Sequence, residues 1–259
     1  MTDLVKIGLP PEVWDAVLVC VFILVAHAGL TAFNFLCKKE KIEHDNAVAG
    51  ILFGVITLIY SLIIAFVIIA VWENYEELNQ TMEKEAEDLN TVLVHSNMLP
   101  DSLRKSVTVA IRNYCQRVVN KEWGASEEHI RLEGSAMPGL RLLLFRARED
   151  SQIQQSIVTV LGENLTNITR LRQERLSHTD AYVPGLVWAI LIIDSILVIF
   201  FSYFLFMHSE RLKRIFLSFL WGMMATSLFL IYMLDHPFRG RGHVSKEPYE
   251  LIIKMLSDQ

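Results

Sequence analysis

The sequence has few of the residues from which most enzyme sites and disulfide frameworks are built. Its 259 residues include three cysteines, 12 glycines and seven prolines. Cys20, Cys37 and Cys115 lack the paired spacing of a zinc site or a redox motif, so we expect three unpaired, packing thiols. No glycine-rich phosphate loop occurs, and no nucleophile has a base at a recognisable spacing. The sequence therefore argues against an enzyme, and it indicates no cofactor and no metal.

Other absences narrow the class of protein further. No alternation of apolar and polar residues persists over the length of a strand, so the expected fold class is all-α. No long basic tract with interleaved aromatic residues occurs, and the net charge is −5, which argues against nucleic acid as a partner. The first 12 residues carry one lysine and lack the basic region of a signal peptide. We therefore expect the apolar segment that follows them to remain in the protein.

Long apolar runs are what the sequence does have. Residues 14–36, 47–72, 184–207 and 215–234 are almost free of charge, and 52% of the whole chain is hydrophobic. Each run is close to the ~20 residues that a helix needs to cross a bilayer. The sequence therefore predicts an all-α membrane protein with four transmembrane helices in two hairpins. Its first partner is the lipid bilayer, and its location is a cell membrane that it crosses several times.

These spans divide the chain into its expected domains. Residues 1–72 form the first hairpin, 73–183 a helical extramembrane domain, 184–234 the second hairpin and 235–259 a C-terminal tail. No proline or glycine stops the helix of the second span at Trp72, so we expect one long helix to about Asn97, before Pro100. Further helices are expected over 103–123, over 140–177 with a break near Asp150, and over 248–256.

One face of the second span carries small and mildly polar residues. Ala47, Gly50, Gly54, Thr57, Ser61, Ala65 and Ile68 recur along it at intervals of three and four. Small residues let helix backbones approach closely in a bilayer, which favours a packing seam. The same face could instead line a pore, with Ile64 and Ile68 as a hydrophobic constriction. Both interpretations are open, and the pore-lining candidates are Gly50, Gly54, Thr57, Ser61, Ile64 and Ile68.

Asp194 lies near the middle of the third span. A charged side chain there costs roughly 2.5 to 3.5 kcal/mol on insertion scales, so it should face protein or water. His27 sits at a comparable depth in the first span. One hypothesis is a proton or ion site formed by Asp194 with His27, Asn34 or Tyr60. The alternative is a protonated or hydrogen-bonded acid that fixes helix packing.

Charged residues gather where the spans meet the expected extramembrane domain. The acidic ones after the second span are Glu73, Glu76, Glu77, Glu83, Glu85, Glu87 and Asp88. Around a symmetric axis, Glu73, Glu76 and Glu77 would form an acidic mouth that concentrates cations; the alternative is a solvated helix face. Before the third span, Arg170, Arg172 and Arg175 are expected to pair with the acidic helix or to stay solvated, with anionic lipid head groups as another option.

Several stretches together resemble one known family. They are Asn46 to Gly50, Trp72 to Tyr75, Glu85-Ala86 with Leu89, Leu99-Pro100, Tyr114 with Glu122-Trp123, Arg172 with Arg175, and Asp235 to Gly240. In this order and spacing they resemble the bestrophin-like family, mostly bacterial membrane proteins classed as a domain of unknown function. The resemblance covers nearly the whole chain and implies a bacterial inner-membrane location. Bestrophins are oligomeric anion channels, so it also implies a pore lined by the second membrane helix and a cytosolic large domain.

The charge pattern at the span ends gives a different topology. The short connections hold Lys38, Lys39, Lys41, Arg211, Lys213 and Arg214 at high density, which favours a cytoplasmic position for them. The large domain would then face the other side, so its location stays open. Asp235 and His236 could suggest a metal site with His44 and His243. The predicted topology argues against it, because His44 falls on the opposite membrane face.

Two functional hypotheses follow from these observations. The first is a homo-oligomeric ion channel whose second spans surround a narrow, largely hydrophobic path for inorganic ions. The sign of the ion is open, because the resemblance implies chloride whereas the acidic mouth favours cations. The second hypothesis is a membrane-anchored helical scaffold or stress sensor without a permeation path, in which the small-residue face is only a packing seam.

Overall fold

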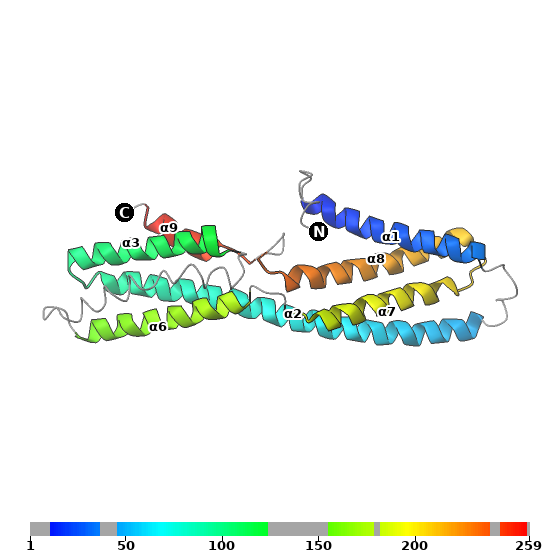
Figure 1. Ribbon diagram of the computed structural model, residues 1–259, viewed down its shortest axis with the longest axis horizontal. Helices are drawn as coiled ribbons and strands as arrows, with labels where there is room; N and C mark the ends of the chain where they lie inside the picture. The colour runs from blue at the N-terminus through cyan, green and yellow to red at the C-terminus, as the bar shows by residue number, and fades with distance from the viewer. Residues whose placement is uncertain (1–10, 37–45, 124–154, 179–181, 239–243, 258–259) are drawn as a thin grey trace. The chain divides into compact units, whose positions relative to one another are not determined.

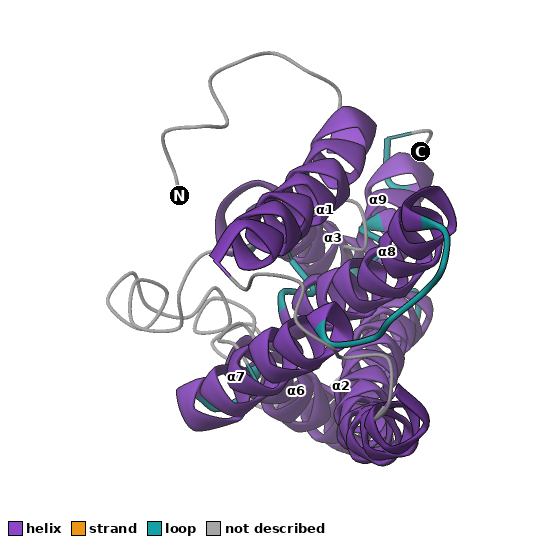
Figure 2. Ribbon diagram, turned by 90° about the vertical axis from the view of Figure 1, so that its right-hand side faces the viewer, coloured by secondary structure: helices purple, strands orange, loops and turns teal. Residues whose placement is uncertain are grey.

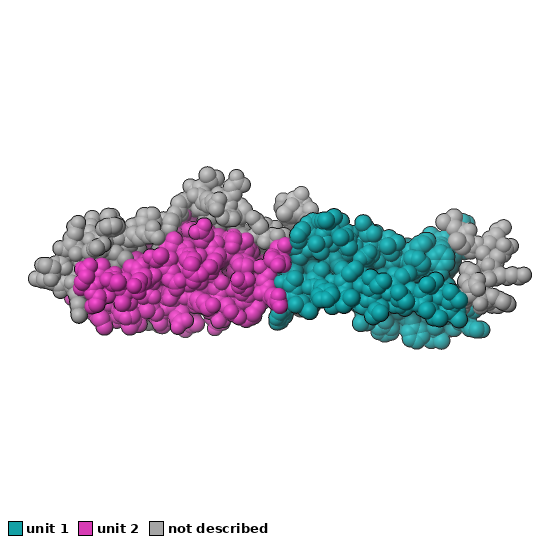
Figure 3. Space-filling model, turned by 90° about the horizontal axis from the view of Figure 1, so that it is seen from below, with its two compact units in different colours: residues 1–72, 183–235 teal, residues 73–182, 236–259 magenta. Residues whose placement is uncertain are grey.

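The computed structural model describes residues 11–36, 46–123, 155–178, 182–238 and 244–257 of the chain (Figure 1). Within these ranges the regular structure is entirely helical, as the sequence predicts. The end-on view in Figure 2 shows the described segments as helices joined by loops. The chain forms two compact units, coloured separately in Figure 3. Unit 1 comprises residues 1–72 and 183–235, and unit 2 comprises 73–182 and 236–259.

Unit 1 is built from apolar helices. It contains α1 (Pro11–Leu36), the first part of α2 (Asn46–Ser96), α7 (Gly185–Tyr203) and α8 (Glu210–Asp235). Among the described residues, α2, α7 and α8 are long and apolar enough to cross a membrane, and α1 has a shorter apolar stretch over Val19–Phe35. Two ends differ from expectation: α7 stops at Tyr203 rather than near 207, and α8 begins at Glu210 rather than 215.

Polar groups of α8 hold both ends of α7. Asp235 accepts the backbone N–H of Val183 at 2.7 Å and the indole N–H of Trp188 at 3.1 Å, just where α7 begins. At the other end, the buried Lys213 donates to the carbonyl of Tyr203 at 3.0 Å. The ends of a helix carry unpaired backbone groups and partial charges, positive at the start and negative at the finish. An acid near the start of α7 and a base at its finish therefore complement these partial charges, and Lys213 also pairs with one terminal carbonyl.

Close packing joins α7 to α1. The hydroxyl of Tyr203 donates to the carbonyl of Ala26 at 2.9 Å. This brings the tyrosine so near to Gly29 that a Cβ atom there would lie 2.5 Å from its oxygen. Gly29 is therefore required by the approach of the ring, not by its backbone conformation.

Unit 2 is a helical bundle with a continuous apolar core. It contains the rest of α2, α3 (Asp101–Arg117), the π-helix η3 (Val118–Glu122), α6 (Gln155–Ser177) and α9 (Glu247–Met255). Residues buried at helical spacing supply the core, among them Leu78, Met82, Leu89, Ile111, Leu161, Leu165, Ile168 and Ile252. The predicted unbroken helix through Trp72 to about Asn97 is confirmed, because α2 runs from Asn46 to Ser96. Residues 124–154, expected to form a loop and further helix, lie outside the described ranges.

Replacing Asp235 by alanine should destabilise unit 1. The change removes the acceptor of two N–H groups, one of them on buried backbone, and each buried donor left unpaired costs about 1–3 kcal/mol. Thermal unfolding of the purified protein in detergent measures the effect. Trp188→Phe removes only the indole donor and should lower the unfolding temperature less. Equal unfolding temperatures for Asp235→Ala and the wild type would contradict a stabilising role of Asp235.

Candidate functional site

The small-residue face of α2 has no partner within the described chain at its glycines. A Cβ atom added to Gly50 or Gly54 would meet nothing within 4 Å. Ser61 is exposed and Thr57 is half-buried, each donating only to a carbonyl of its own helix. These residues therefore do not form a packing seam against the described parts of their own chain. Close packing of another helix on this face would require a second molecule.

Ile64 differs from the other pore-lining candidates. It is only 7% exposed in unit 1, whereas Ile68 is half-buried. A side chain that packs inside its own chain cannot at the same time face a pore. Ile64 is therefore not open to a pore in this structure, whereas Gly50, Gly54, Thr57, Ser61 and Ile68 stay predictions.

A second exposed face of α2 carries bulky apolar residues. Ile51, Val55, Leu58, Leu62, Phe66 and Ile69 recur at intervals of three and four, and each is at least half exposed. The same intervals continue through Glu73, Glu76, Gln80, Glu83 and Glu87, which are also exposed. Because α2 is one helix, this spacing places the apolar and acidic residues on one face. The sequence analysis did not identify this stripe, because it selected a face of the helix by the small size of its residues, whereas the exposure of side chains is known only from the structure.

Asp194 and His27 have different surroundings. Asp194 is half-buried on α7, and its neighbour Ser195 accepts a hydrogen bond from Tyr60 of α2 at 2.8 Å while donating to Leu191. His27 Nε2 lies 2.7 Å from the hydroxyl of Ser218 on α8. Its ring also meets Trp221 edge-on at 4.9 Å. The hypothesis of a site shared by Asp194 and His27 stays a prediction, and Tyr60 bonds the residue next to Asp194.

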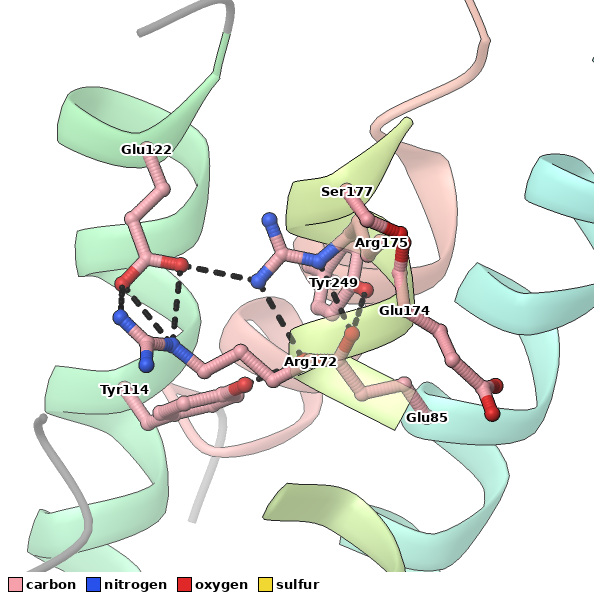
Figure 4. Close-up of polar contacts among 8 residues, drawn as sticks. All are labelled: Glu85, Tyr114, Glu122, Arg172, Glu174, Arg175, Ser177 and Tyr249. Atoms are coloured by element: carbon pink, nitrogen blue, oxygen red, sulfur yellow. Dashed lines mark hydrogen bonds and ion pairs between the residues drawn. The ribbon is translucent and has the colours of Figure 1, made fainter. Parts of the chain in front are cut away.

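A buried row of alternating charges lies in unit 2 (Figure 4). Arg175 of α6 donates through Nε to Glu85 of α2 at 2.9 Å and through a terminal nitrogen to Glu122 of η3 at 2.9 Å. Arg172 donates to the other oxygen of Glu122 at 2.7 Å. Glu85 and Arg175 are both fully buried, and Glu122 is nearly so. Two carboxylates thus alternate with two guanidinium groups, and Nε of Arg117 also lies 3.8 Å from Glu122.

Two tyrosines complete the coordination of Glu85. Tyr114 of α3 donates to one oxygen of this carboxylate, and Tyr249 of α9 donates to the other at 2.9 Å. The ring of Tyr249 also lies 5.8 Å from the guanidinium of Arg175. Every oxygen of the buried acid therefore has a donor, as burial of a charge requires. The groups come from α2, α3, η3, α6 and α9, so this row ties unit 2 together.

The pKa shifts follow from burial and from the neighbouring charges. Burial, followed by the charge of Glu85, holds the pKa of Tyr114 and Tyr249 well above their usual value. Burial alone would raise the pKa of Glu122. The hydrogen bonds and charges of Arg172 and Arg175 together outweigh it and lower that pKa. Burial raises the pKa of the nearby Cys115 thiol to about 12, so it is an inert packing group.

The sequence singled out most members of this row, but only as residues that carry the family resemblance. Glu85, Tyr114, Glu122, Arg172 and Arg175 all belong to the stretches that carry the family resemblance. Pairing of an arginine with the acidic helix is confirmed for Arg175.

For Glu85 the sequence analysis gave the wrong surroundings, and it missed Tyr249 altogether. Counting Glu85 among residues of a solvated acidic face was wrong. It continues the buried spacing of Leu78 and Met82 toward Leu89, a signal that the sequence contained. Tyr249 was missed because it lies 164 residues from Glu85, and no local pattern links the two.

The acidic mouth residues and the possible metal ligands lie elsewhere. Glu73, Glu76 and Glu77 are exposed on α2. Among the residues that the structure describes, no three His, Cys, Asp or Glu side chains come together as a metal site. His44 and His243 fall outside the described ranges.

Removing Arg175 should strongly destabilise unit 2. Arg175→Met leaves Glu85 and Glu122 buried without their shared cation, and breaking a buried pair in this way costs about 3–5 kcal/mol. Chemical denaturation measures the loss. Arg170→Met removes an exposed pair with Glu174 and should cost less than about 1 kcal/mol. Adding Glu85→Gln to Arg175→Met should recover part of the loss, and a purely additive result would contradict the coupling.

The contribution of Glu122 should depend on pH. Its folded-state pKa lies below the unfolded value, so its stabilisation is complete above the unfolded pKa of about 4.3 and is lost as the pH falls through the folded value. The wild type should therefore unfold at a higher temperature than Glu122→Gln near neutral pH, and the gap should close in acid. The exposed Glu163→Gln serves as control, with no such gap. A pH-independent gap would contradict the ionic role.

The comparisons with known proteins agree with this architecture. The family model of the bestrophin-like domain matches residues 10–249. No curated protein matches the sequence. Among solved structures, a bacterial bestrophin homologue from Klebsiella pneumoniae aligns with a TM-score of 0.68 at 14% identity, covering 95% of this chain and 97% of its own. The crystal structure of another membrane protein aligns equally well, at 13% identity over 96% and 98%. At these identities the structural match shows the fold, and the domain match shows that this chain belongs to the bestrophin-like family.

Proposed function

We propose that the protein is an oligomeric ion channel in which α2 of each subunit faces a central axis. Family membership and the bestrophin-like fold support a channel. The observation that carries the proposal is the exposed stripe of α2, which is apolar through the span and acidic beyond it. A helix that presents such a face along its whole length is suited to a path that runs from water into a narrow apolar passage.

The two open faces of α2 have different roles in this proposal. The bulky face, with Leu58, Leu62 and Phe66, turns toward the axis because it is in phase with the acidic residues. Its apolar side chains form a constriction that gates by excluding water. The small-residue face, with Gly54 and Ser61, then meets the neighbouring subunit, where it permits close approach of the helices. The axis-facing surface is thus a different one from that expected from small residues alone.

The mouth of the path is acidic. Glu73, Glu76 and Glu77 are exposed and would be repeated around the axis by each subunit. Rings of carboxylates raise the local concentration of cations. The resemblance to anion channels implies the opposite preference, so the reversal potential in asymmetric salt decides the sign of the ion.

Enlarging the constriction should raise the unit conductance. In planar bilayers, Phe66→Ala should conduct more than the wild type, because it shortens an apolar side chain that is 65% exposed on the proposed axis-facing side. Ile196→Ala, on the exposed face of α7, is the matched control and should leave conductance unchanged. No current from the wild type or from Phe66→Ala in any salt would refute the channel and favour the scaffold.

A further inference from the structure

Asp194 is a polar group without a hydrogen bond from the described residues of unit 1. It is half-buried in the middle of α7, and within the described chain no hydrogen bond or ion pair involves its carboxyl group. An acid at this depth is unfavourable in lipid and is expected to face protein or water. Its own described chain supplies no hydrogen bond to this carboxyl group, so a hydrogen-bond partner from another molecule would lower the cost of placing it in the bilayer.

The hydrogen bond between Tyr60 and Ser195 sets the depth of Asp194. This bond joins α2 to α7 at 2.8 Å. Ser61 follows Tyr60 and Asp194 precedes Ser195, so each lies about 1.5 Å along its helix from one member of the pair. Because the tyrosine side chain is itself about as long as one helical turn, Ser61 and Asp194 lie within roughly one turn (5.4 Å) of each other in depth. Among the described residues, no hydrogen bond joins the two within one chain.

Ser61 is open to a partner from another molecule. Its side chain is exposed and donates at 2.8 Å to the carbonyl of Leu58 in its own helix. A hydroxyl can accept from a carboxylic acid, or rotate and donate to a carboxylate. Thr57 lies about one helical turn from Ser61 and Gly54 about two turns. Both have small side chains, which lets another helix approach closely, and a Cβ atom added to Gly54 would have no neighbour within 4 Å.

We propose that Asp194 of one subunit hydrogen-bonds Ser61 of the next subunit. This inference rests on the proposed oligomeric channel. Subunits around an axis normal to the membrane share one depth for each residue, so two groups close in depth within one chain are also close in depth between chains. A second copy of the chain packs against the small-residue face of α2, and it places the carboxyl group of its Asp194 on that face. The bond closes the interface and removes the cost of an unpaired acid in the bilayer.

Cysteine cross-linking of the full-length oligomer tests the contact. In a background with Cys20 and Cys37 replaced and the buried Cys115 retained, Asp194→Cys with Ser61→Cys should form disulfides between subunits under mild oxidation. A ladder of covalent oligomers on a denaturing gel is the expected result. The matched control is Ile196→Cys with Ser61→Cys, since Ile196 is 59% exposed and points away from Asp194 on α7.

Further pairs test the predicted depth. Thr57 lies about 6 Å from Ser61 along α2, so Asp194→Cys with Thr57→Cys should cross-link more weakly. Thr226 of α8 is an exposed hydroxyl that competes for the same role. Cross-linking to Thr226→Cys in preference to Ser61→Cys would overturn the proposal. So would rapid modification of Asp194→Cys by a charged, water-soluble thiol reagent, because the carboxyl group would then face a water-filled path.

A second measurement does not depend on cysteines. Asp194→Leu and Ser61→Ala should each weaken assembly in mild detergent by roughly 3- to 30-fold, the range expected for one hydrogen bond between membrane helices. Asp194→Asn should retain assembly, because the amide still donates and accepts. Combining Asp194→Leu with Ser61→Ala should add little to either change, and full additivity would overturn the contact. A wild type that is monomeric would refute the oligomeric channel itself, whereas a conducting oligomer insensitive to these changes refutes only this contact.

Discussion

The shared hydrogen bonding of Arg175 to Glu85 and Glu122 is the interaction on which the rest of unit 2 depends. A leucine-rich core tolerates small slides between helices, because apolar contact has little direction. Buried charges do not, since each must keep its donor or acceptor at hydrogen-bond distance. Glu85 lies on α2, Glu122 on η3 and Arg175 on α6, so the row forms only when all three elements are in register. Tyr249 extends the same requirement to α9.

Unit 1 follows a different physical rule. In a bilayer the lipid is as apolar as the side chains, so burial alone gives helices little reason to associate. The described contacts accordingly include several specific polar ones: Asp235 and Lys213 at the ends of α7, Tyr60 with Ser195, and His27 with Ser218. Gly29 adds a close approach, because a side chain at this position would displace the hydroxyl of Tyr203. Few bonds thus carry much of the specificity, and each is expected to be sensitive to substitution.

Local sequence patterns were sufficient for the helices but not for the contacts between them. Proline at position 100 and the absence of any stop after Trp72 predicted the extent of α2, because both act on neighbouring backbone. Glu85 could have been placed in the core from its spacing with Leu78, Met82 and Leu89, yet its charged side chain suggested exposure to water. No such pattern exists for Tyr249 or for the partner of His27. Their contacts join residues far apart in the chain, and they arise only from the three-dimensional packing.

The unbroken course of α2 has a mechanical consequence. At about 1.5 Å per residue, its 51 residues make a rod of roughly 76 Å. No proline or π-bulge interrupts it between Phe66 and Glu85, and such interruptions are what commonly allow a helix to bend sharply. Its backbone hydrogen bonds therefore run without a break from the apolar part of α2 to the acidic part. Bending α2 sharply between these two parts would require some of these helical hydrogen bonds to break.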